Sequence, residues 1–236
     1  MRIWLWLIPA LLLGIGLGIV LASRAVPEEP GSGESTIDTS GETEEPIEAT
    51  SANHFGLAAS WEYSAGDHER YQGWIDAAVA RSAAEASRLI IINKSAYRLY
   101  LVEGGEIAAE YPVELGGDPV HDKRMEGDNT TPEGNYQLAA HHDLGHTSFH
   151  RGYFIDYPNE LDRREFARGQ ADGSIPAGAS IGGAIMIHGE GSGLPGNDGG
   201  YNWTLGCIAL SNADIDELWD KLERGLPVVI VRYGEV

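Results

Sequence analysis

The chain of 236 residues is poor in cysteine and in positive charge. Its single cysteine, Cys207, excludes a disulfide within the chain. Only 16 Lys and Arg side chains stand against 36 Asp and Glu, which gives a formal net charge of −20. Because so acidic a chain repels a phosphate backbone, nucleic acid is excluded as a partner. The acidity is uneven, since residues 27–52 hold eight acidic side chains and no Lys or Arg.

Charge is also missing from residues 3–22, which are all apolar or small. A run of this length can cross a bilayer core of roughly 30 Å as a helix. We expect residues 1–25 to be an uncleaved signal-anchor rather than a cleaved signal peptide, because residues 20–22 make a mediocre cleavage site. Arg2 favours a cytoplasmic N-terminus. The rest of the chain is then expected in the periplasm, either anchored to the inner membrane or secreted if the N-terminus is cleaved.

The remaining sequence divides by composition. Residues 26–66 form an acidic linker rich in Glu, Ser, Thr, Gly and Pro, which buries too little apolar surface to fold. Apolar residues at helical spacing predict a helical lead-in over 67–87. Residues 88–236 suit one domain, and the 31 glycines of the chain favour turns and short strands over a helical bundle.

Within that domain the pattern predicts a mostly β fold with a few peripheral helices. One helix is expected over 160–168, capped by Asn159 and stopped by Gly169, and another from Ser211 or Asn212 to Gly225. Residues 169–183 are a Gly/Ala/Ser loop and a candidate flap. Strands are expected at 89–92, 97–102, 107–115, 135–140, 152–157, 184–187 and 227–231.

Four histidines lie close together in sequence, and three of them (His142, His146 and His150) have the spacing of one helical face. Three imidazoles on a face are typical of a metal site. However, Gly145 interrupts the stretch, and strand-like sequence lies on both sides of it. We therefore interpret the cluster, which also includes His141, as a loop and predict no metal site.

Cys207 and His188 are the strongest candidates for chemistry. A thiol becomes a useful nucleophile when a base removes its proton, and an imidazole at the end of a rigid strand is a suitable base. Each candidate has a glycine beside it, Gly206 before Cys207 and Gly189 after His188. Glycine suits places where the backbone must approach a substrate closely. A core histidine and a core cysteine would explain neither these glycines nor the Gly/Asn-rich excursion between the two residues.

The chain from about 89 to 231 resembles the YkuD-type L,D-transpeptidase catalytic domain. The resemblance rests on His188-Gly189, on Thr204-Leu205-Gly206-Cys207-Ile208 and on Asn212. Upstream, Lys123…Glu126-Gly127-Asp128…Thr131-Pro132-Glu133-Gly134 is similar to the loop before the first long strand of that family. The resemblance implies a β-sandwich-like fold.

Two positions depart from the pattern of that family. Leu205 stands where a second histidine is usual, and Ala209 where an arginine is common. Such an arginine is suited to a peptide carboxylate. Arg151, Lys123 and Arg124 are candidates to replace it.

The resemblance implies that Cys207 attacks a carbonyl of a peptidoglycan stem peptide and forms a thioester. His188 would take and return the proton, and Gly206 would offer a backbone N–H to the oxyanion. Gly189, Thr204 and Asn212 are, with Lys123 and Arg151, the candidate substrate-binding residues. No metal or organic cofactor is implied, and a wall-attached protein is a further candidate partner.

Two alternatives stay open at this point. The same scaffold and nucleophile would serve a peptidoglycan hydrolase, an L,D-carboxypeptidase or an amidase, if water replaced the acceptor amine. The other alternative is a non-catalytic wall-binding module with a structural Cys207. A papain-like fold is disfavoured because it places the cysteine before the histidine in sequence.

Overall fold

The fold is described from a computed structural model, which describes residues 64–191 and 202–236. The predicted N-terminal anchor and most of the acidic linker lie outside these ranges. Over the described residues, the helices and strands follow in this order: α1 (Ala65–Glu85), β1 (Arg88–Asn93), β2 (Arg98–Glu103), β3 (Glu106–Pro112), β4 (Gly134–His142), β5 (Gly152–Ile155), α2 (Glu160–Asp172), β6 (Met186–Gly189), β7 (Ile208–Leu210), α3 (Asn212–Trp219) and β8 (Pro227–Val231).

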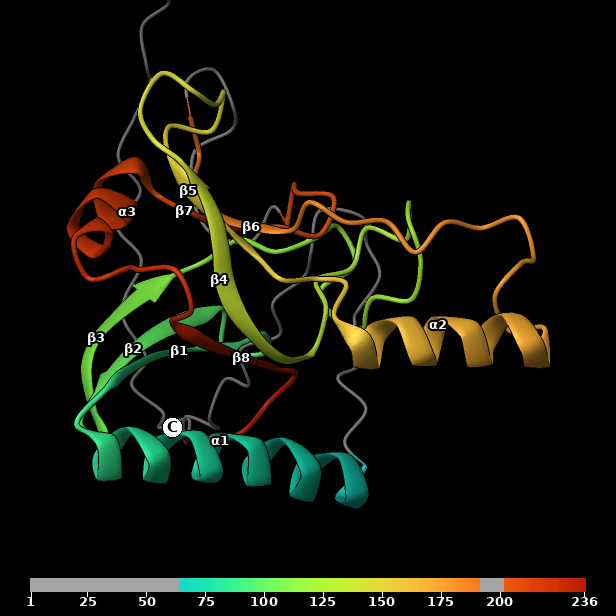
Figure 1. Cartoon of the computed structure of the whole chain (residues 1–236), viewed down its shortest axis with the longest axis horizontal. Coiled ribbons are helices and arrows are strands. Elements are labelled where there is room, and N and C mark those ends of the chain that lie inside the picture. Colours follow the sequence, from blue (N-terminus) through green and yellow to red (C-terminus); the bar gives the residue numbers. More distant parts are fainter. Residues whose placement is uncertain (1–63, 192–201) are drawn as a thin grey trace, which may run out of the picture. The chain divides into compact units, whose positions relative to one another are not determined.

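The strands form one sheet in the order β3-β2-β1-β8-β4-β5-β6-β7 (Figure 1). Neighbouring strands are antiparallel except for the pairs β1–β8 and β6–β7, which are parallel. Apolar runs explain the central strands, since β1 and β8 are buried along almost their whole length. The prediction of a mostly β fold with few helices is confirmed.

A single large core joins both ends of the sheet. Ile90 and Leu101, from β1 and β2, belong to the same buried cluster as Ile187 and Ile208, from β6 and β7. The sheet therefore folds over on itself around this core. Beyond β3 the chain meets β7, where the amide and carbonyl of Glu114 both hydrogen-bond with Ala209 at 2.9 Å. The expected sandwich-like packing is thus achieved by one folded sheet.

Helix α1 covers the opposite face of β1, β2 and β8, along the lower edge of Figure 1. Tyr71 and Ile75 on this helix pack with Leu89, Val229 and their neighbours in a second, smaller cluster. Ser64 begins the helix, because its side chain accepts a hydrogen bond from the Asp67 amide at 3.0 Å.

A buried ion cluster ties α1 to the loop that precedes β4. We call it the Glu133 cluster; its members are Tyr71, Lys94, Asp122, Glu133 and Arg232. Lys94 and Glu133 form an ion pair of 2.8 Å with exposed side-chain fractions of 0% and 1%. Arg232 lies 3.0 Å from the same carboxylate, the Tyr71 hydroxyl donates to it, and Asp122 accepts from the Glu133 amide at 2.8 Å.

Helices α2 and α3 both end at residues other than those predicted. Helix α2 begins at the predicted cap, Asn159, but continues through Gly169 to Gly173. Gly169 is buried, and a Cβ there would lie 2.7 Å from the Ile175 side chain, so it serves packing rather than termination. Helix α3 is capped by Ser211 and ends at Trp219, earlier than predicted, because turns follow as far as β8.

Among residues 64–191 and 202–236, no helix combines the length and the apolar character needed to span a bilayer. The predicted membrane helix falls on residues 1–25, outside these ranges, and stays a prediction.

Candidate active site

Neighbouring parallel strands bring the two candidate catalytic residues to the same edge of the fold. In the register of β6 and β7, Ile187 pairs with Ile208 and His188 with Ala209. Cys207 comes directly before β7, two residues before the partner of His188. Because side chains two positions apart on a strand share a face, the thiol and the imidazole emerge on the same side of the sheet.

His188 is held firmly and is shielded from water. Its side chain is almost fully buried, with the Phe149 ring 4.5 Å and the Trp203 ring 5.9 Å from its own, centre to centre. Nδ1 lies 2.6 Å from the Gly189 carbonyl oxygen. Since a carbonyl only accepts, Nδ1 carries the proton and Nε2 has the free lone pair of the neutral ring. Burial lowers the pKa of His188, and the bond to Gly189 opposes this.

Gly152 on β5 makes the position of His188 possible. A Cβ on Gly152 would lie 2.6 Å from the His188 Cβ and 2.7 Å from the Ile187 carbonyl oxygen. Any larger residue would therefore push β5 away from β6.

The Cys207 thiol is partly exposed and points to the backbone of the preceding segment. Its sulfur donates a hydrogen bond to the Ala184 carbonyl over 3.7 Å, whereas no hydrogen bond joins the thiol to His188 in this structure. Burial raises the pKa of Cys207; the Met186 backbone and the positive charge of Lys123 act in the opposite direction. Both the thiol and the imidazole are thus neutral near pH 7.

Thr204 shapes the turn that presents Cys207. Its Oγ1 accepts from the Gly206 amide at 3.1 Å and donates to the Cys207 carbonyl at 2.8 Å. Gly206 has φ +130°, and a Cβ there would lie 2.5 Å from the Thr130 carbonyl oxygen. The Gly206 amide is therefore engaged by Thr204 in this structure, and its predicted role as an oxyanion donor stays a prediction.

Asn212 and Gly189 shape the turn after β6. The Asn212 amide group accepts from the Gly191 N–H at 3.0 Å and donates to the Gly191 carbonyl at 3.1 Å. A Cβ on Gly189 would lie 2.6 Å from the Asn212 Oδ1. The sequence predicts substrate binding by Thr204, Gly189 and Asn212. In the structure the polar side-chain groups of Thr204 and Asn212 make hydrogen bonds within the protein, and Gly189 packs closely against Asn212.

Lys123 lies close enough to the site to act on the thiol, but its ammonium group is not free. Its side chain is 3% exposed, 2.8 Å from Asp128 Oδ1 and 3.2 Å from the Met125 carbonyl oxygen. Although burial acts to raise it, the pKa of Asp128 is held below its ordinary value by Lys123 and by three backbone N–H groups. The sequence-predicted carboxylate binder is thus an internal ion pair beside the nucleophile.

The other two predicted cations also have partners. Arg151 lies 3.1 Å from Asp216 on α3 and stacks over the Trp219 ring at 4.8 Å. His150 contacts the same Asp216 carboxylate at 2.9 Å. Arg124 donates to the Ser174 hydroxyl at 2.7 Å, which joins the 123–128 loop to the segment after α2.

The remaining histidines of the cluster do not converge. His141 packs against the Tyr153 and Trp219 rings, and His142 against Phe154. Within the described part of the chain, no three His, Cys, Asp or Glu side chains lie close enough to hold a metal ion.

The candidate flap borders a charged pocket. The Glu126 amide donates to the Ser180 carbonyl at 2.8 Å, so this loop packs on the 123–128 loop. Between them and α2 lies a cavity of about 270 Å³, whose lining includes Lys123, Arg124, Glu165 and Asp172.

The two positions that depart from the expected pattern have opposite environments. Leu205 is 77% exposed, one of the few large apolar side chains at the surface of the described residues. Ala209 is fully buried and paired by its backbone to Glu114.

Sequence reasoning missed the carbonyls of Gly189 and Ala184, because backbone direction leaves no sequence signal. The rings of Phe149 and Trp203 were missed as well.

Comparison with known proteins identifies the domain. The model of the family described as YkuD, L,D-transpeptidase catalytic domain, matches residues 87–230. No curated protein matches the chain.

Solved structures also show likeness. The helical cell shape determining protein Pgp2 from Campylobacter jejuni is 24% identical, with a TM-score of 0.47 over 64% of this chain and 49% of that one. Bd1075 from Bdellovibrio bacteriovorus is 24% identical, with a TM-score of 0.45 over 63% and 49%. An L,D-transpeptidase from Xylanimonas cellulosilytica is 20% identical, with a TM-score of 0.39 over 61% and 60%. The match thus spans about half the length of the first two.

Proposed function

The chain belongs to the L,D-transpeptidase catalytic domain family, and on that basis we propose that it is a cysteine-dependent L,D-transpeptidase acting on peptidoglycan stem peptides. The observation that carries the proposal is the pairing of β6 with β7, which puts a partly exposed thiol and a buried, oriented imidazole on one face of the sheet. A nucleophile, a base and a group that orients the base are the elements of covalent acyl transfer.

In the proposed reaction the Cys207 side chain turns from the Ala184 carbonyl toward Nε2 of His188. Nε2 takes the thiol proton as sulfur forms a bond to the substrate carbonyl carbon. The C–N bond to the departing D-amino acid then breaks, and the same proton passes to the leaving nitrogen. An acceptor amine then attacks the thioester carbonyl and gives its proton to Nε2. The C–S bond breaks as the new amide forms, and Nε2 returns the proton to sulfur, which regenerates the thiol.

The charges of the neighbourhood favour this sequence. Because burial lowers its pKa, His188 is unprotonated near pH 7 and is ready to act as a base. The positive charge of Lys123 stabilises the negative charge that develops on sulfur. Because Thr204 occupies the Gly206 amide, we assign the oxyanion to the backbone N–H of Cys207 itself. In the cell we place the domain in the periplasm, tethered by residues 1–25.

The decisive experiment incubates purified muropeptides with the wild type and with Cys207→Ala, and resolves the products by mass spectrometry. We expect new cross-links with loss of the terminal D-amino acid in the wild type only. Intact-protein mass should show a thioester on Cys207 in the wild type. Equal products from both proteins would overturn the cysteine mechanism. Loss of the D-amino acid without new cross-links would instead identify a hydrolase on the same scaffold.

A further inference from the structure

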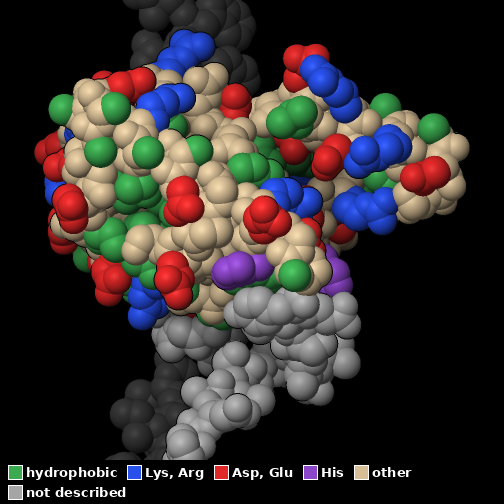
Figure 2. Space-filling view, turned by 90° about the horizontal axis from the view of Figure 1, so that it is seen from below, with side chains coloured by type: hydrophobic (Ala, Val, Ile, Leu, Met, Phe, Trp, Pro, Cys, Tyr) green, Lys and Arg blue, Asp and Glu red, His purple; other side chains and the backbone are tan. Residues whose placement is uncertain are grey.

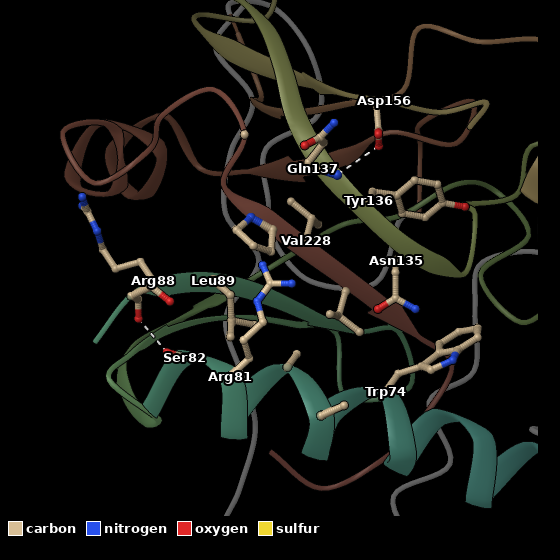
Figure 3. A pocket seen from close by; sticks show the side chains of 16 residues that line it. Trp74, Arg81, Ser82, Arg88, Leu89, Asn135, Tyr136, Gln137, Asp156 and Val228 are labelled. Atoms are coloured by element: carbon tan, nitrogen blue, oxygen red, sulfur yellow. Dashed lines mark hydrogen bonds between the residues drawn. The ribbon is translucent and has the colours of Figure 1, made fainter. Parts of the chain in front are cut away.

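A cavity lies away from the thiol, between α1 and β4. It has a volume of about 570 Å³, within the range of small-molecule sites, and is formed by α1, the start of β1, β4 and β8. Figure 3 shows Trp74 and Arg81 rising from α1 below, with Asn135 and Gln137 on β4 above them. Its lining contains neither His188 nor Cys207.

The register of the sheet explains which side chains of β4 line this cavity. Asn135 pairs with Val229 and Gln137 with Pro227, so both amides point to the face that carries α1. Tyr136 and Leu138, between and beyond them, point into the large core. Helix α1 packs on β1, β2 and β8, and the side chains of Asn135 and Gln137 on β4 are exposed beside the helix.

The charged groups of the cavity already have partners. Arg81 pairs with Glu85 at 3.6 Å, and Arg88 with Glu223 at 3.5 Å. Asp156 accepts from the Gln137 backbone N–H at 3.0 Å. Across the face seen in Figure 2, acidic and basic side chains are interspersed rather than gathered by sign. The cavity therefore offers no surplus charge to an ionic ligand.

What the cavity offers is amide groups and an aromatic ring. Neither the Asn135 nor the Gln137 side chain hydrogen-bonds another described residue, so each has donors and an acceptor to offer. Trp74 is partly exposed and braced by the Tyr71 ring, 5.6 Å away and roughly perpendicular. Paired amides beside a braced indole suit an uncharged ligand that has apolar ring faces and many hydroxyl or acetamido groups.

We propose that the α1–β4 cavity binds an N-acetylated saccharide chain. The hydroxyl and acetamido groups would hydrogen-bond to Asn135 and Gln137, while a sugar face packs on Trp74. The identification of that chain with the glycan of the wall polymer rests on the proposed function. A glycan held there would tether the domain to the polymer whose stem peptides reach Cys207.

The test uses the purified full-length chain and chitotetraose, a tetramer of N-acetylglucosamine, with binding measured by calorimetry. Trp74→Ala and Gln137→Ala should each weaken binding on the order of tenfold, about the value of one good contact. Trp74→Phe should keep part of the affinity, and Gln170→Ala on α2, a matched amide outside the cavity, should leave it unchanged. Thermal unfolding confirms that each variant is folded.

The inference is overturned if chitotetraose shows no saturable binding, if maltotetraose (which lacks acetamido groups) binds equally well, or if the cavity variants bind like the wild type. Cys207→Ala should bind chitotetraose as the wild type does. Saccharide binding without cysteine-dependent products would remove the proposed function and leave this site. Cysteine-dependent products without saccharide binding would remove only this site.

Discussion

The candidate active site and the Glu133 cluster are both buried polar centres, but they handle charge in opposite ways. At the site, burial keeps Cys207 and His188 neutral, and their contacts are mainly to backbone groups. In the Glu133 cluster, a carboxylate lies between Lys94 and Arg232 and stays ionised: burial acts to raise its pKa, but Lys94 holds it below its ordinary value.

This contrast assigns reactivity to the candidate active site and stability to the Glu133 cluster. A neutral thiol and imidazole can exchange a proton when a substrate arrives, because neither is locked in an ion pair. A compensated buried ion pair cannot lose a partner without leaving a charge stranded in a medium of low polarity. The loop between the two regions links them, since the carbonyl of Thr130 touches Gly206 while Thr131 and Glu133 accept from Lys94.

The largest expected effect is on chemistry, from His188→Gln. Without the base, acylation of Cys207 by a muropeptide should slow on the order of 10⁴-fold, about 5.5 kcal/mol in barrier height. Intact-protein mass spectrometry in single-turnover mode measures the rate. In the wild type the rate should fall only in solutions more acidic than the ordinary titration range of histidine, since burial lowers the pKa of His188 and its base form persists through that range. A rate unchanged by the substitution would remove His188 from the mechanism.

The next effect is on stability, from Glu133→Gln. The variant keeps the shape of the side chain but leaves the buried Lys94 ammonium without its counter-charge, which should cost about 3–5 kcal/mol. Urea unfolding measures it. Glu223→Gln is the matched control: its pair with Arg88 is 66% exposed on the Glu223 side, and its loss should be below about 1 kcal/mol. If Glu133→Gln instead slowed acylation as strongly as His188→Gln at unchanged stability, the separation of the two regions would fail.

Sequence patterns predict some parts of this molecule and not others, for physical reasons. The apolar run at 89–92 predicts β1, because a strand buried on both faces must be apolar at every position. Gly169 misleads, since its role depends on Ile175, which the helical pattern does not contain. Lys94, Glu133 and Arg232 look like surface charges in sequence and meet only through the sheet.

The groups of the candidate active site also fall into those that sequence patterns predict and those that they do not. A lone cysteine after a glycine, and a histidine at the end of an apolar run, are visible in sequence, and the structure puts their strands side by side. The groups that orient them are carbonyls and amides of Gly189, Ala184 and Met186, which every residue has. Side chains predicted to bind substrate, such as Thr204, also shape the turns.

A third prediction concerns the turn that couples the two regions. Gly206→Ala places a Cβ 2.5 Å from the Thr130 carbonyl oxygen at φ +130°, where side chains are strained. We expect a loss of about 1–3 kcal/mol in unfolding free energy and slower acylation of the folded fraction by a muropeptide, because Cys207 follows directly. Gly104→Ala, in the turn between β2 and β3, is the matched control: it also has positive φ, at +58°, but nothing lies within 4 Å of an added Cβ. It should lose stability without losing the acylation rate, whereas equal acylation defects in both would point to general strain.

The smallest expected effect comes from Asp122→Asn and depends on pH. Burial and the charge of Glu133 raise the pKa of Asp122 to about 7, so the folded state favours its protonated form. The stability that Asp122 contributes is present below its unfolded pKa of 3.8 and is lost as pH rises through 7. Asn stays neutral and can still accept from the Glu133 amide. The variant should therefore gain stability relative to the wild type between pH 5 and pH 8, by no more than about 3 kcal/mol, since each of the two pH units from 5 to 7 carries about 1.4 kcal/mol. Urea unfolding at the two pH values measures the gain, with Asp76→Asn on the exposed side of α1 as the control. A gain that is the same at both pH values would mean that Asp122 is ionised throughout. The Glu133 cluster would then carry one more negative charge at pH 5 than a pKa of about 7 for Asp122 implies.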